Sequence, residues 1–368
     1  MGAGKVCFLI LACNLLLNLP VLSQKHDYTW VLGYAGGDLS PDEDTFGLSI
    51  LHFAEESLQI SDNQEGEALF RGTNASFSNS DASFFCSFDG TDLYNADHEV
   101  MEGGGDWFDG DFSAGWSYPQ SGLILPFPED SSRAALINTQ TNRYEIGGQM
   151  IGVGENIYFS EIDQSAAEGL GAVVVRKELL LSDTVDIGKL SACRHANGRD
   201  WWIIMPEFDS NRFYRYLLTP FGIRLEGIQE IGGVVPSGVG QAFFSPDGTK
   251  HIRFNGISLE DGEYTTIYNF DRCTGLLSDF QQFNYPAYGV GPGAVISKNS
   301  RFLYTTSSIN LYQYDLWAED IEATRTLVAV YDGHLDFLPT TFYLGQLAPD
   351  GKIYIASNNG VTSLHVIH

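Results

Sequence analysis

Three aspartates on one glycine-flanked stretch are the residues of this sequence best suited to hold a metal ion. The segment DWFDGDFSAG contains Asp106, Asp109 and Asp111, and Glu102 lies just before it. Oxygen-only ligands on a flexible loop suit Ca²⁺, although the spacing does not match the twelve-residue calcium loop. A solvated acidic loop is therefore the alternative. No His or Cys cluster has zinc spacing, so we expect no obligatory cofactor, with Ca²⁺ as the one candidate ion.

His195 is the residue that comes closest to a general base. It follows Arg194 and precedes Asp200, and an imidazole titrates in the range where general bases work. However, no Gly-x-Ser-x-Gly elbow supplies a nucleophile. His195 also lies at a strand–turn–strand corner, where capping and packing are common roles. We therefore assign no catalytic residue and keep His195 as a candidate binding residue.

Three glutamines open predicted strands at equivalent places. They are Gln120 in PQSGLILP, Gln241 in GQAFF and Gln346 in GQLAP. The first strands of a radial repeat line its central channel, so these amides and His195 are candidates for binding a ligand there. The alternative is that the amides hydrogen-bond neighbouring units and hold the ring together.

The cysteines do not form a disulfide scaffold. Three of the five lie beyond the N-terminal apolar segment: Cys86, Cys193 and Cys273. An odd number points away from a framework of bridges, yet a secreted protein can still form one. We predict a bridge between Cys193 and Cys273, because both lie at predicted strand ends. Cys86 lies in an aromatic run and is expected to be a buried thiol.

The elements that position these residues repeat at an interval near fifty residues. Strand–turn–strand stretches are separated by 50, 52 and 51 residues, with turns at Gly198, Gly248, Ser300 and Gly351. Two earlier turns lie at Asp81 and Ser131, and the 67 residues from Ser131 to Gly198 predict an inserted hairpin. Each unit contains four short strands rich in β-branched and aromatic residues, such as QAFFS, HIRFNG, TTIYNFDR and FQQFNYP. This pattern is typical of a β-propeller.

We therefore predict an all-β fold, a β-propeller of seven four-stranded blades over residues 25–368. The first and last blades are expected to be incomplete. YTWVLGY, FGLSILHF and GEALFRG form a unit without its first strand, and the last unit stops at SLHVIH. The C-terminal closure is thus predicted to be missing, either because the ring is open or because the chain is part of a longer one. A pair of β-sandwiches would not explain the regular interval.

The Ser245-Pro246-Asp247-Gly248 stretch that marks the repeat is predicted to be a corner. Proline sets φ for a turn, aspartate accepts local backbone hydrogen bonds, and glycine supplies positive φ. A loop-borne carboxylate site is the alternative. The corner is favoured because Asn, Ser and Asp replace one another between units.

The N-terminal segment and the overall charge indicate a compartment. Within residues 1–24, the positively charged Lys5 precedes a short, interrupted apolar run that ends at a polar junction, which is typical of a secretory signal peptide. A membrane anchor is the alternative. The formal net charge of −27 argues against nucleic acid and anionic membrane surfaces as partners. We expect a secreted protein with no membrane span after cleavage, whose partners are extracellular glycans or proteins.

Long stretches of the chain resemble a known class of protein. GKLSACRHANGRDWWIIMP, NRFYRYLLTPFGI, GQAFFSPDGTKHIRFNG, FDRCTGLLSDF and LAPDGKIYIA are similar to the N-terminal propeller region of large secreted bacterial surface proteins. In those proteins PKD-like modules and a gliding-motility-associated C-terminal sorting domain follow. The resemblance implies attachment to the cell surface and downstream domains, and it carries over no catalytic residue.

These observations favour a non-enzymatic module over an enzyme. We expect a binding or scaffold head of an adhesin-like surface protein, because loops of many blades meet at a propeller's rim. The alternative is a propeller hydrolase of the lactonase type with a metal at the channel mouth. That activity needs carboxylate, Asn or His side chains converging at the channel, which the glutamine pattern does not supply.

Overall fold

The computed structural model describes residues 25–33, 48–54, 57–63, 70, 73–107, 119–146, 149–258, 262–286 and 292–368. The predicted signal peptide lies outside these residues, as do Asp109 and Asp111. Within them, helix is limited to two single 3-10 turns, η2 (Ala167–Gly169) and η3 (Glu322–Thr324). Nowhere in these ranges is there a helix with the length and apolar character needed to cross a membrane.

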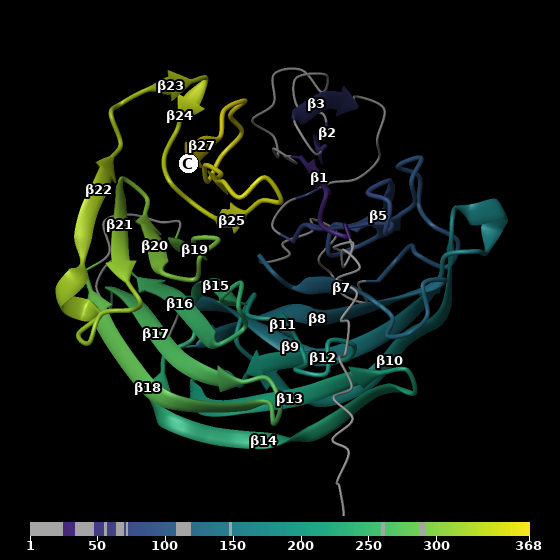
Figure 1. Ribbon diagram of the computed structural model, residues 1–368, viewed down its shortest axis with the longest axis horizontal. Helices are drawn as coiled ribbons and strands as arrows, with labels where there is room; N and C mark the ends of the chain where they lie inside the picture. The colour runs from purple at the N-terminus through teal and green to yellow at the C-terminus, as the bar shows by residue number, and fades with distance from the viewer. Residues whose placement is uncertain are drawn as a thin grey trace, which may run out of the picture.

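Seven small antiparallel sheets form the seven blades of a β-propeller, fanned around a common centre (Figure 1). The predicted fold is confirmed. Blades 3 to 6 each have four strands that pair in chain order. Blade 3 is β7 (Gly122–Pro126), β8 (Arg133–Ile146), β9 (Gln149–Asp163) and β10 (Ala172–Val185). Blade 4 is β11 (Ser191–Arg194), β12 (Trp201–Pro206), β13 (Ser210–Thr219) and β14 (Gly222–Val235). Blade 5 is β15 (Val239–Phe244), β16 (Lys250–Ser258), β17 (Gly262–Asp271) and β18 (Leu276–Tyr285). Blade 6 is β19 (Pro292–Ile296), β20 (Phe302–Ser307), β21 (Asn310–Asp315) and β22 (Thr326–Val330).

The remaining three blades have three strands each. Blade 1 is β1 (Thr29–Leu32), β2 (Leu48–Phe53) and β3 (Leu58–Asn63). Blade 2 is β4 (Ala75–Ser78), β5 (Phe84–Phe88) and β6 (Leu93–Tyr94). Blade 7 is β25 (Gly345–Leu347), β26 (Ile353–Ile355) and β27 (His365–Ile367), preceded by a hairpin of β23 (Leu335–Asp336) and β24 (Leu338–Pro339).

Two details of the strand prediction need correction. Blade 1 does not lack its first strand, because β1 lies beside β4, where Thr29 N–H donates to Ser78 Oγ (3.1 Å) and Val31 N–H to Ser76 Oγ (3.0 Å). Its third strand is β3, whose sequence is polar and mostly exposed and so carries no apolar signature. The predicted strand GEALFRG lies outside the described residues except for Phe70. The extra residues of blade 3 lengthen β8, β9 and β10 to 14, 15 and 14 residues instead of adding a hairpin.

The core is divided among the contacts between blades. Ile203, Ile204 and Met205 are consecutive on β12 and all fully buried, because a central strand of a blade is covered on both faces. Within the described residues, an apolar cluster lies at every contact between neighbouring blades. Each blade is therefore stabilised mainly by its two neighbours.

The first and last blades pack against each other. Trp30 and Phe53 of blade 1 contact Tyr354 of blade 7, with ring centroids 5.9 Å and 5.7 Å apart in edge-on geometry. Ala348 completes this cluster. Blades 1 and 7 each have three strands, yet their side chains join the two ends of the ring.

Candidate functional site

The Ser-Pro-Asp-Gly stretch forms a closed turn between β15 and β16. Asp247 Oδ1 accepts hydrogen bonds from the Thr249 N–H (3.0 Å), the Thr249 hydroxyl (2.9 Å) and the Ser245 hydroxyl (2.6 Å). Gly248 has a φ of 71°, which favours glycine. Asp247 Oδ1 is thus hydrogen-bonded within its own turn, as expected of a residue that stabilises a corner.

Two of the three predicted glutamines hydrogen-bond to other blades, including blades that are not their direct neighbours in the ring. The Gln120 side chain donates to the Ala242 carbonyl (2.9 Å) and accepts from the Ala242 N–H (2.8 Å), so blade 3 bonds to blade 5. Gln241 Oε1 accepts from the N–H groups of Ala294 (2.9 Å) and Gly345 (3.2 Å), linking blade 5 to blades 6 and 7. Gln346 is exposed. The amides of Gln120 and Gln241 thus hydrogen-bond to other blades, as expected if they hold the ring together.

His195 does not join the glutamines. It follows the end of β11, whereas Gln120 and Gln241 lie at the starts of inner strands. Its Nδ1 accepts from the Asn197 N–H (2.9 Å), so Nε2 carries the ring N–H and donates to the Cys273 carbonyl (3.2 Å). The ring also stacks on Trp202. Nδ1 is thus used inside the β11–β12 turn of blade 4, and Nε2 connects this turn to the turn after β17 of blade 5.

The predicted disulfide is not formed in the structure. Cys193 and Cys273 are both free thiols, as is the buried Cys86. Cys193 packs in the apolar cluster between blades 4 and 5, and burial raises its pKa to about 11. Cys273 is exposed in the turn after β17. One side chain is in the core and the other faces solvent, although Cys193 lies near the end of β11 and Cys273 just after the end of β17.

The predicted calcium loop is described only at its start. Asp106 has a φ of 55°, and its N–H donates to Asp92 Oδ1 (2.8 Å). Asp109 and Asp111 lie outside the described residues, so the calcium site stays a prediction. In the parts of the chain that the structure describes, no three His, Cys, Asp or Glu side chains are grouped to hold a metal ion.

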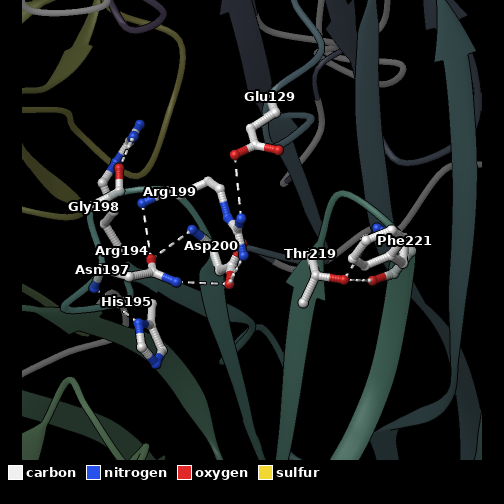
Figure 2. A network of polar contacts seen from close by, with 10 residues as sticks. Glu129, Arg194, His195, Asn197, Gly198, Arg199, Asp200, Thr219 and Phe221 are labelled. Carbon is white, nitrogen blue, oxygen red and sulfur yellow. Dashed lines mark hydrogen bonds and ion pairs between the residues drawn. The ribbon is translucent and has the colours of Figure 1, made fainter.

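An open hollow of about 440 Å³ lies between the β7–β8 turn of blade 3 and the β11–β12 turn of blade 4 (Figure 2). It is lined by Glu129, Asn197, Gly198 and Arg199. The Arg199 guanidinium holds Asp200 with two hydrogen bonds, Nε to Oδ1 at 2.7 Å and Nη2 to Oδ2 at 3.1 Å. It also reaches Glu129 Oε1 at 3.2 Å. We call this the blade 3–4 hollow.

The wall of the blade 3–4 hollow is held by its own turn. Asn197 Oδ1 accepts from the N–H groups of Arg199 (2.9 Å) and Asp200 (3.0 Å), and Gly198 has a φ of 74°. Asp200 is buried, which raises its pKa, but hydrogen bonds from Arg199 and Asn197 outweigh burial and keep that pKa below its usual range. Asp200 therefore stays ionised and anchors Arg199.

Aromatic and cationic groups lie around this turn. The Arg194 guanidinium donates to the Gly198 carbonyl (2.8 Å) and stacks over Trp201 at 4.4 Å. Phe221, in the β13–β14 turn of the same blade, is 95% exposed (Figure 2). Polar donors and acceptors beside aromatic faces are suited to binding a ligand.

Sequence reasoning missed Glu129, Arg199 and Phe221 as candidate residues. A signal for the first two was present, because Glu129 and Arg199 lie in the turns aligned at Ser131 and Gly198 of consecutive repeats. Equivalent turns of neighbouring blades lie next to each other on one rim. Residues at such turns are therefore expected to form a common surface.

The comparisons with known proteins support the fold. No family model matches the sequence, and no curated protein matches it. A putative 6-phosphogluconolactonase from Bacteroides uniformis ATCC 8492 is similar in structure, with a TM-score of 0.53 and 12% identity over 92% of this chain and 95% of that one. A periplasmic gluconolactonase from Pseudomonas aeruginosa has a TM-score of 0.48 and 13% identity, over 92% and 90% of the two chains. At such identities, the first of these likenesses establishes the β-propeller fold and nothing finer.

Proposed function

We propose that this chain is a non-enzymatic, extracellular binding module that takes a hydroxyl-rich ligand, such as a glycan, in the blade 3–4 hollow. The observation that carries the proposal is the pairing of a fixed cation with an exposed carboxylate at the hollow. Arg199 is held by the buried Asp200, while its contact with Glu129 faces solvent.

The exposure of this pair makes it replaceable by a ligand. The side chains of Arg199 and Glu129 are 40% and 61% exposed, and an exposed ion pair contributes only about 0–1 kcal/mol. Ligand hydroxyls can therefore donate to the carboxylate and accept from the guanidinium at little cost. Trp201 and Phe221 offer flat apolar faces nearby for the carbon side of a sugar ring.

The extracellular setting rests on the sequence. Residues 1–24 have the pattern of a secretory leader, and the chain carries a net charge of −27. The resemblance to propellers of large bacterial surface proteins supports a role as the head of an adhesin-like protein.

The test is a glycan array probed with the protein, followed by titration of any glycan that binds. Arg199→Ala is expected to weaken binding about tenfold or more. Arg224→Ala is the matched control, because Arg224 is also an exposed arginine paired with a glutamate, on the outer strand of the same blade. Equal affinity of both variants would place the ligand elsewhere.

The same preparation separates the proposal from the hydrolase alternative. Hydrolysis of gluconolactone and of its 6-phosphate is measured with and without added divalent cations. If hydrolysis requires a divalent metal and no glycan on the array binds, the proposal of a binding module would be wrong. A hydrolase of the lactonase type would then be the better description.

A further inference from the structure

The contact between blades 4 and 5 contains a fully buried group of charges. Asp186 and Lys189, on the connection between β10 and β11, and Arg253, on β16, are all 0% exposed. Arg253 binds Asp186 Oδ2 through Nη2 (2.7 Å) and Nε (2.9 Å). Lys189 Nζ donates to the carbonyls of Ile187 (2.8 Å) and Gly238 (2.7 Å).

This group has an excess of positive charge. Burial raises the pKa of Asp186, but Arg253 and Lys189 outweigh it and hold the carboxyl ionised. Burial lowers the pKa of Lys189 to about 8, so the amine is still mostly protonated at pH 7. Two cations therefore face one carboxylate in a place closed to water. Such an uncompensated buried charge is costly unless another ion balances it.

Hydrogen-bond donors beside this group lack partners. Arg253 Nη1, Thr266 Oγ1 and Tyr268 OH are buried and find no acceptor among the residues that the structure describes. Arg253 lies opposite Thr266 in the register of β16 and β17, and His251 lies opposite Tyr268. Directly opposed residues share one face of a sheet, so all four side chains project toward blade 4, where Ser191 Oγ lies 3.2 Å from His251 Nε2.

Some acceptors in this layer are also unused. His251 Nδ1 and Asn255 Oδ1 have no donor in the described part of the chain. The Asn255 amide is fixed by bonds from Nδ2 to Asp186 Oδ2 (3.1 Å) and the Pro236 carbonyl (2.7 Å). A water molecule that donates to one of these acceptors can share the site with an ion that takes the donors.

We propose that the layer between blades 4 and 5 binds one small monovalent anion of the halide class, held by Arg253 Nη1 and the hydroxyls of Thr266 and Tyr268. The anion balances the excess positive charge of the Asp186, Lys189 and Arg253 group. A monatomic ion suits the site because every one of its donor atoms is closed to solvent.

The acidity of the whole chain does not oppose this site. Ionic screening limits the reach of exposed carboxylates to about 8–10 Å in physiological salt. The charges of the buried group, by contrast, act on the site at short range and with little screening. Chloride is also the commonest small anion that a secreted protein meets, and it enters when the blades open locally.

The first test is thermal unfolding of the whole chain in sodium chloride, sodium bromide and sodium gluconate at equal ionic strength. Both halides are expected to raise the midpoint in a saturable way relative to gluconate. Thr266→Val and Tyr268→Phe are each expected to weaken the affinity for halide about tenfold, so that about ten times more halide is needed for the same rise in the midpoint. Thr265→Val is the matched control, because Thr265 is buried on the opposite face of the same strand, and it should leave the effect intact.

The second test does not depend on the folding of a variant. A crystal grown in bromide should give an anomalous peak within hydrogen-bond distance of Arg253 Nη1, Thr266 Oγ1 and Tyr268 OH. Water without an anomalous signal at that position, or equal midpoints in halide and gluconate, would overturn the anion site.

Discussion

Single residues in the turns show how backbone geometry and packing combine. Gly248 and Gly198 have nearly equal φ values of 71° and 74°, so any side chain there has the same backbone strain. Their surroundings differ, because a Cβ at Gly248 would lie 2.7 Å from Arg272 Cδ and 2.8 Å from Cys193 Sγ, whereas nothing lies within 4 Å at Gly198.

We therefore predict that Gly248→Ala destabilises the protein more than Gly198→Ala. The shared strain costs about 1 kcal/mol, and the clash at Gly248 adds about 1–3 kcal/mol. Urea denaturation of both variants measures the difference. Equal losses would mean that Arg272 and Cys193 move aside freely.

Glu263 makes folding depend on pH. Burial raises its pKa from 4.5 to about 7, and a hydrogen bond from Ser307 opposes the rise. The folded state thus binds more protons than the unfolded state between pH 4.5 and 7. The contribution of Glu263 to stability is therefore lost as pH rises through this window, by up to about 1.4 kcal/mol per pH unit.

Replacing Glu263 by Gln is expected to stabilise the protein at pH 8 by about 1–3 kcal/mol. The gain should shrink as the pH falls through this window and level off below pH 4.5, where the native glutamate becomes protonated in both states. Chemical denaturation of the wild type and E263Q at several pH values measures it. A gain that does not change with pH would show that Glu263 is not the titrating group.

At the residue scale, the corner residues were predictable and the buried charges were not. Asp247 and Gly248 lie in a local motif whose turn chemistry can be read directly. Asp186 and Arg253 are 67 residues apart, Arg253 in the predicted strand HIRFNG and Asp186 just before the next repeat. Only the packing of blade 4 on blade 5 brings them together, and no local pattern encodes that contact.

The inner strands are joined by side chains as well as by packing. Gln241 bonds two other blades while it is almost fully buried, whereas Gln346 is at an equivalent place but exposed. Gln241 is buried because its side chain reaches backbone groups of Ala294 in blade 6 and Gly345 in blade 7.

We predict that Gln241→Ala costs about 1–3 kcal/mol of folding free energy, because it leaves the N–H groups of Ala294 and Gly345 buried without an acceptor. Hydrogen exchange of these two amides should speed up. Gln346→Ala serves as control and is expected to change stability by less than about 0.5 kcal/mol. If both variants were equally stable, Gln241 would not hold the ring.

The strands themselves were predictable to different degrees. Central strands have runs such as WWIIMP in β12 that stand out from the turns around them. The outer strand β3 has the polar sequence LQISDN, because it faces water and is set by pairing with β2. Strand length in blade 3 was likewise not readable, since longer strands and an added hairpin give the same repeat interval.

The whole molecule depends on a contact that joins its first and last blades. Trp30 and Phe53 pack on Tyr354. We predict that Tyr354→Ala costs about 3–5 kcal/mol, as for other large aromatic side chains removed from a core. Phe221→Ala is the control, because Phe221 is 95% exposed and its loss should change stability by less than about 0.5 kcal/mol.

Thermal or chemical denaturation measures both variants, and limited proteolysis reports where the Tyr354 variant opens. Cleavage is expected first in blades 1 and 7. Cleavage that begins in blade 4 or 5 would contradict a ring whose weakest contact is the one between its first and last blades.

The contact between blades 7 and 1 also sets how the molecule responds to force. Among the described strands, the polypeptide crosses each of the other six contacts as it passes from one blade to the next, and no strand pairing joins blades 7 and 1. Within the described residues, the separation of blades 1 and 7 is therefore resisted at this contact by the packing of side chains. Under force we expect blades 1 and 7 to separate before any single blade unfolds. The ring should then open at one defined position, the contact between blades 7 and 1.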